Sequence, residues 1–107
     1  MSIYSKVDFY QQQPNLSKER RTELLISRVI KKYKITKEEL LSDTRRRHIV
    51  EPRQIALFAM HKKYGYTSQG AGDYFGKDHA TVLYASKNIK GIMETDKDFN
   101  RLVNELI

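Results

Sequence analysis

Apolar residues recur at helical spacing through most of this chain, and that periodicity restricts it to an all-α fold. Leu25, Val29 and Tyr33 follow one another at four-residue intervals on one face, while lysines and arginines occupy the opposite face. No stretch shows the strict alternation of a half-buried strand. A chain of 107 residues is long enough for one core of ordinary size and too short for two. We therefore predict a single all-α domain.

Capping residues divide the chain into about six helices. Ser17 is placed to begin the first of them, and Thr36, followed three residues later by Glu39, is a capping box. Pro52 disfavours helix at the residue before it but fits a first helical turn, so we expect the next helix to start there. Gly65 is placed to end that helix.

The beginning of the chain, which contains "QQQPN", shows no sustained period. We predict that residues 1–16 form a flexible tail and that residues 17–107 form the folded domain. The absence of cysteine excludes a disulfide framework and a thiolate metal site. No stretch reaches the roughly 20 apolar residues of a bilayer span, and the N-terminus lacks the apolar core of a signal peptide. We expect a cytoplasmic location without membrane contact.

The excess of positive charge is concentrated in less than half of the chain. The net charge is +7, and residues 45–90 hold nine lysines and arginines against three acidic residues, a net +6. Such a field attracts polyanions, of which nucleic acid is the commonest for a soluble protein. Charge alone also fits a basic surface that is merely solvated.

The polar residues do not form an enzyme site. The three histidines have no metal-ligand spacing, and no G-x-x-x-x-G-K-[ST] phosphate loop is present. Asp78 and His79 are adjacent, so at a helix start their side chains point about a hundred degrees apart and make a poor acid/base pair. We predict no catalytic activity, no cofactor, no nucleotide and no metal.

The segment "TSQGAGDYFGKDHATV" has the outline of a helix-turn-helix. Thr67 would cap a short first helix, and Asp78 would cap a second helix after a tight turn at Gly76. In such a motif the first turn of the second helix faces base edges in the major groove. The plain alternative is a helical hairpin with an ordinary aspartate cap.

An arginine run, "TRRRH", precedes this motif in the chain. An exposed, extended arginine segment suits insertion into a narrow minor groove. Arg53 and Gln54 open the next predicted helix, and helix starts are ready phosphate sites. Arginine-rich surface loops are common, so the run acquires meaning only together with the helix-turn-helix.

Residues 45–89, "RRRHIVEPRQIALFAMHKKYGYTSQGAGDYFGKDHATVLYASKNI", resemble the C-terminal DNA-binding domain of the bacterial replication initiator family DnaA. The "PRQIA" and "DHATV" motifs carry the resemblance through their identity and their spacing. It implies a Trp-repressor-like fold with a helix-turn-helix that binds double-stranded DNA at DnaA-box sites, in replication initiation or its regulation.

The resemblance also implies which residues contact DNA. Bases would be contacted by Arg45 in the minor groove and by Asp78, His79, Ala80 and Thr81 in the major groove. By the resemblance, phosphates would be contacted by Arg53, Gln54, Thr67, Ser68 and Gln69. The charge of Arg46, Arg47 and Lys77 beside these motifs makes them further expected phosphate contacts.

Three features depart from the family pattern. Ala80 stands where the family usually has a threonine, which removes a hydroxyl from the base-reading quartet. Ser68, Gly70 and Gly72 occupy a segment that typically holds a leucine-proline pair and a glutamate, and one glycine is missing before Lys77. Finally, the family's ATPase module is absent from these residues. We expect a stand-alone, nucleoid-associated DNA binder from a phage, plasmid or other source, or an excised domain.

Two other functions for the same fold stay open at this point. One is a protein-interaction module that binds an initiator or replisome protein. The other is a transcriptional repressor.

Overall fold

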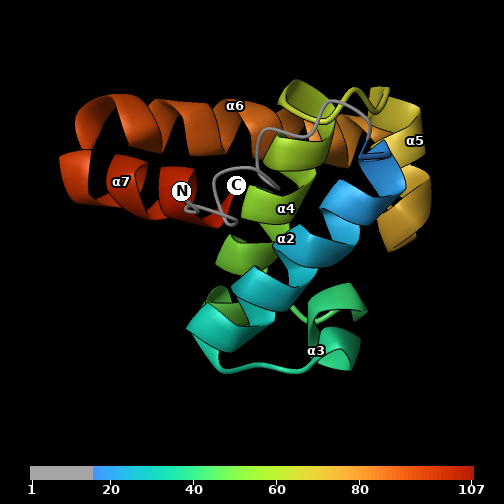
Figure 1. Cartoon of the computed structure of the whole chain (residues 1–107), viewed down its shortest axis with the longest axis horizontal. Helices are drawn as coiled ribbons and strands as arrows, with labels where there is room; N and C mark the ends of the chain where they lie inside the picture. Colours follow the sequence, from blue (N-terminus) through green and yellow to red (C-terminus); the bar gives the residue numbers. More distant parts are fainter. Residues whose placement is uncertain (1–15) are drawn as a thin grey trace, which may run out of the picture.

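The computed structural model describes residues 16–107, which form six α-helices around one core (Figure 1). In chain order the helices are α2 (Lys18–Tyr33), α3 (Lys37–Leu41), α4 (Arg47–Lys62), α5 (Ser68–Phe75), α6 (His79–Thr95) and α7 (Lys97–Leu106). Residues 16–107 contain no strand, so the predicted all-α fold with about six helices is confirmed. The tail predicted for residues 1–16 lies, apart from Leu16, outside the described residues.

Helix α4 is the centre of the domain. Residues 55–60, "IALFAM", are all buried, because α4 packs against α2, α3, α5 and α6. A helix that is apolar on every side is stable only inside a core. The surrounding helices bring the complementary stripes, with Leu25 and Val29 from α2 and Val82 and Ile89 from α6. The long α6 crosses one end of α4 and turns back into α7 (Figure 1).

The predicted start of the central helix at Pro52 is wrong. The helix begins five residues earlier, at Arg47, and the backbone N–H groups of Ile49 and Val50 both donate to the carbonyl oxygen of Arg46. Pro52 lies inside α4 and is fully buried, as is Ile49 at 1 % exposed. Burial of these two side chains offsets the one backbone hydrogen bond that a proline cannot donate.

The predicted N-caps at Ser17 and Thr36 are confirmed. Ser17 Oγ accepts the Arg20 N–H at 3.0 Å, and Thr36 and Glu39 exchange both hydrogen bonds of a capping box. Each of these caps depends on residues within one helical turn, which is why the sequence predicts them well.

The C-cap of α4 is Lys63, two residues before the predicted Gly65. Gly65 adopts the left-handed conformation, with φ of 87°, in the connection that follows.

Candidate nucleic-acid interface

Helices α5 and α6 are joined by the tight turn that a helix-turn-helix requires. Gly76 has a left-handed φ of 66°, and its N–H donates to the carbonyl oxygens of Asp73 and Gly72. The Lys77 N–H also donates to Gly72, at 2.8 Å. An alanine Cβ at position 72 would overlap the Lys77 carbonyl oxygen and lie 3.3 Å from that of Asp78. Glycine at position 72 therefore permits this close approach of the turn to α5.

Helix α6 begins at His79, directly after its cap. Asp78 Oδ1 accepts hydrogen bonds from the Thr81 N–H and the Thr81 hydroxyl, each at 2.8 Å. These two bonds, the backbone one first, hold the pKa of Asp78 below its usual value. The predicted cap is confirmed. His79, Ala80 and Thr81 are all exposed on the first turn, and the Asp78 carboxylate is bonded to Thr81 rather than to His79.

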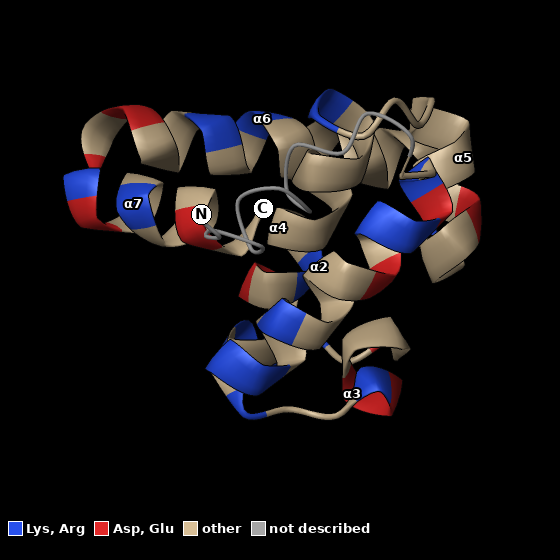
Figure 2. Cartoon of the chain, viewed as in Figure 1, with Lys and Arg blue, Asp and Glu red and all other residues tan. Residues whose placement is uncertain are grey.

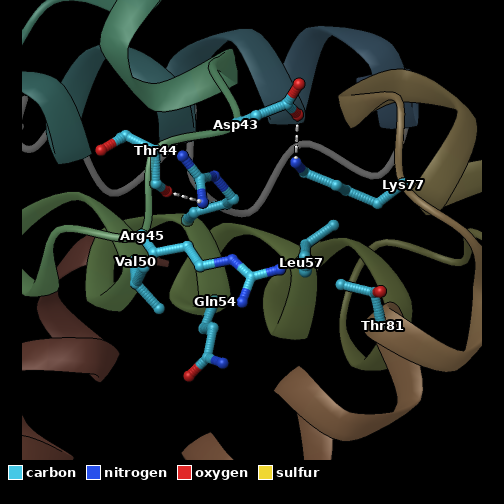
Figure 3. A pocket seen from close by; sticks show the side chains of 9 residues that line it. Asp43, Thr44, Arg45, Val50, Gln54, Leu57, Lys77 and Thr81 are labelled. Atoms are coloured by element: carbon cyan, nitrogen blue, oxygen red, sulfur yellow. Dashed lines mark hydrogen bonds and ion pairs between the residues drawn. The ribbon is translucent and has the colours of Figure 1, made fainter.

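The segment between α3 and α4 runs beside this helix start (Figure 3). A hollow of about 320 Å³ separates them, and Arg45, Gln54, Lys77 and Thr81 are among the residues that line it. The Arg45 side chain extends across the hollow toward Leu57 (Figure 3). The tertiary structure thus brings the arginine segment and the first turn of α6 to the same surface, although they lie far apart in the sequence.

The arginine run is only partly extended, which corrects the predicted extended segment. Arg45 and Arg46 precede the helix, but Arg47 is the first residue of α4. Arg46 is its N-cap residue and forms no side-chain capping bond, so the positive end of the helix is left for other partners. Basic segments are visible on the last turn of α2 and on the middle of α6 (Figure 2).

Arg53 does not open a helix, contrary to the prediction. It lies inside α4 at 6 % exposed, and its Nε donates to the Leu40 carbonyl at 2.9 Å. Its Nη1 donates to the Thr44 carbonyl at 3.0 Å. Burial lowers the pKa of Arg53, and the nearby Asp43 carboxylate acts in the opposite direction. The guanidinium therefore holds the backbone at Thr44, next to Arg45, in place. The family resemblance implies a different role for Arg53, a contact to a DNA phosphate.

Gln54 likewise lies within α4 rather than at its start. Its Oε1 accepts a hydrogen bond of 2.7 Å from Asn88 Nδ2, which ties α4 to α6 at the edge of the hollow. Gln54 lines the hollow together with Thr81, and its amide nitrogen is a further hydrogen-bond donor there.

The start of α5 matches the predicted cap. Thr67 Oγ1 accepts the Gly70 N–H at 2.9 Å, and Ser68 and Gln69 are the first two helical residues. Gln69 is exposed and Ser68 is half-buried. The structure describes all three at the helix start, where backbone N–H groups suit an anion.

Lys77 is engaged within the chain. Its Nζ lies 2.6 Å from Asp43 Oδ1, so the turn before α6 is joined to the segment after α3 (Figure 3). The sequence does not reveal this pair, because Asp43 lies outside every motif.

Two exposed residues of α6, Leu83 and Tyr84, are not among the DNA contacts predicted from the sequence. Leu83 is 47 % exposed and Tyr84 is 64 % exposed. Leu83 follows His79 by four residues and Tyr84 follows Ala80 by four, so both continue the exposed face of the first turn. The sequence holds the signal, since the buried stripe of Val82, Ala85 and Ile89 leaves Leu83 and Tyr84 outside the core.

Among residues 16–107, no group of three histidine, cysteine, aspartate or glutamate side chains is arranged to hold a metal ion. None of the helices there combines the length and apolar content that crossing a bilayer needs.

Known proteins are similar to this chain over the same region. The family model described as "Bacterial dnaA protein helix-turn-helix" matches residues 22–89. The Chromosomal replication initiator protein DnaA of Synechococcus sp. (strain JA-2-3B'a(2-13)) is 33 % identical over 95 residues, covering 88 % of this chain and 20 % of that protein. The same-named protein of Flavobacterium psychrophilum is 36 % identical over 83 residues, covering 76 % and 17 %. The chain spans about a fifth of the length of these curated relatives.

Proposed function

This chain belongs to the bacterial DnaA helix-turn-helix family, and on that premise we propose that it binds double-stranded DNA sequence-specifically at DnaA-box-like sites. The observation that supports this most is the shared hollow. Arg45 and Thr81 of the first turn of α6 both line it, so the two segments lie on one surface, as a combined minor-groove and major-groove contact requires.

The individual roles follow from exposure and chemistry. His79 can donate to or accept from a base edge, and Ala80 offers a methyl group to a thymine methyl. Thr81 gives its hydroxyl hydrogen to Asp78, so it would present its methyl group and its lone pairs. Arg46, Arg47, Gln69 and the helix starts supply phosphate contacts that set the register. The role we propose for the whole protein is in replication initiation or its regulation.

Duplex binding tests the proposal directly. A duplex with a DnaA box should bind at least about a thousandfold more tightly than a scrambled duplex of equal length and base content, as specific binders generally do. The measurement is fluorescence anisotropy at several salt concentrations, without ATP. Equal affinity for the two duplexes would rule out sequence-specific binding, and capture of an initiator protein with no DNA binding would favour a protein-interaction module.

Replacing His79 should weaken discrimination at one base pair. The expected loss for His79→Ala on the box duplex is about 1–3 kcal/mol, with little change on scrambled DNA, because the lost group reads a base. Arg46→Gln is the matched control, since a phosphate contact should weaken both duplexes alike. If His79→Ala left the ranking of single-base variants of the box unchanged, His79 would not read a base.

A further inference from the structure

Asp43 supplies the one carboxylate among the residues that line the hollow. It meets the Lys77 ammonium at 2.6 Å on the rim of the hollow that Arg45 and Thr81 also line (Figure 3). The Asp43 side chain is 95 % exposed, whereas that of Lys77 is only 17 % exposed. A partner that approaches from solvent therefore reaches the carboxylate more readily than the ammonium.

The surroundings keep this carboxylate charged. The hydrogen bond from Lys77, then its charge, and finally the charge of Arg53 hold the pKa of Asp43 below its usual value. In charge and geometry the pair resembles a lysine bound to one oxygen of a phosphate.

We propose that Asp43 sets the sequence-independent part of the DNA affinity by competing with DNA phosphate for Lys77. This inference rests on the proposed function and extends it to a residue outside the family motifs. Lys77 lies directly before the cap of α6, so a phosphate beside the recognition turn is the anion that it would otherwise take. When DNA binds, Lys77 passes from the carboxylate to the phosphate.

The exchange leaves Asp43 without its cation, beside a polyanion. The Asp43 carboxylate and the DNA phosphates, both negative, repel each other at such short range. At 0.1 M salt this repulsion is largely screened only beyond about 10 Å. Exposed ion pairs are weak, so the competition should lower affinity severalfold rather than abolish binding. The same factor applies to every duplex, because phosphates carry no sequence information.

The test is Asp43→Asn, which keeps the shape of the side chain and removes its charge. We expect binding about three- to tenfold tighter on both the box and the scrambled duplex. The plot of log K against log salt concentration should become steeper by up to about one, because an uncompensated cation then meets a phosphate. Thermal melting of each variant confirms that it is folded.

Asp98→Asn is the matched control for charge. It removes the same charge from another exposed ion pair, Asp98 with Arg101 at 3.5 Å, but on α7 and outside the hollow. Its affinity should stay within about twofold of the unmodified chain.

A Lys77→Gln background shows whether Asp43 acts through Lys77. In that background Asp43→Asn should no longer increase the affinity for DNA. An undiminished increase would mean that the carboxylate repels phosphates directly, and would overturn the proposed exchange of Lys77 between Asp43 and phosphate. Unchanged or weaker DNA binding by Asp43→Asn alone would also overturn the exchange. Weaker binding would mean that Asp43 serves to hold the segment that carries Arg45. If neither the unmodified chain nor Asp43→Asn binds any duplex, the proposed function itself fails; if the unmodified chain binds, only the exchange is in question.

Discussion

Replacing Gly72 by alanine is expected to lower the free energy of unfolding by about 2–3 kcal/mol. The added Cβ would overlap the carbonyl oxygen of Lys77, which is backbone and cannot rotate away. Relief requires the turn to move off α5, and the N–H of Lys77 then loses its bond to the Gly72 carbonyl. The higher helix propensity of alanine returns only about 1 kcal/mol of this cost. Urea denaturation followed by circular dichroism measures the change.

Gly91→Ala separates the clash from the effect of glycine as such. Gly91 lies in α6, and nothing stands within 4 Å of the Cβ that alanine would add. This variant should gain up to about 1 kcal/mol. If Gly72→Ala were as stable as Gly91→Ala, the close approach of the turn to α5 would not be as the structure has it.

Replacing Arg53 by leucine is expected to cost about 2–3 kcal/mol of unfolding free energy. The carbonyl oxygen of Leu40 would lose a buried donor and that of Thr44 a partly buried one, and an unsatisfied group costs about 1–3 kcal/mol when water cannot reach it. The free energy of unfolding of Arg53→Lys should lie between those of the unmodified chain and of Arg53→Leu. One ammonium group cannot reproduce the two separate hydrogen bonds of the guanidinium. DNA affinity should also fall, because Thr44 directly precedes Arg45. Thermal and urea denaturation give the stability.

Arg46→Leu is the comparison that distinguishes anchoring from DNA contact. Arg46 is exposed, so its replacement should change stability by no more than about 0.5 kcal/mol while weakening DNA binding. Should Arg53→Leu instead keep full stability and lose only DNA affinity, Arg53 would be a phosphate ligand, as the family resemblance implies, and not an anchor.

The caps show what could be read from the sequence. Ser17, Thr36, Thr67 and Asp78 each bond to a backbone N–H three residues ahead, so the residue types and their spacing contain the whole interaction. The exception, Pro52, is instructive. Local rules placed a helix start there, and burial of Pro52 and Ile49 in the core overrode them.

The candidate site could be predicted in part. Its helix-turn-helix residues form one continuous segment, so their exposure on the first turn of α6 followed from the cap and the apolar stripe. The roles of Arg53 and Lys77 did not follow. A basic residue in a basic sequence suggests phosphate binding, and only the fold shows that each already has a partner.

The helix caps, the apolar faces and the family resemblance can be read from the chain alone, because they are properties of neighbouring residues. Packing in three dimensions brings the arginine segment and the first turn of α6 to one surface. It also decided that Arg53 reaches a carbonyl 13 residues away and that Lys77 meets an aspartate 34 residues away. Such pairs form only when packing around α4 brings distant segments together, and no local pattern encodes that proximity.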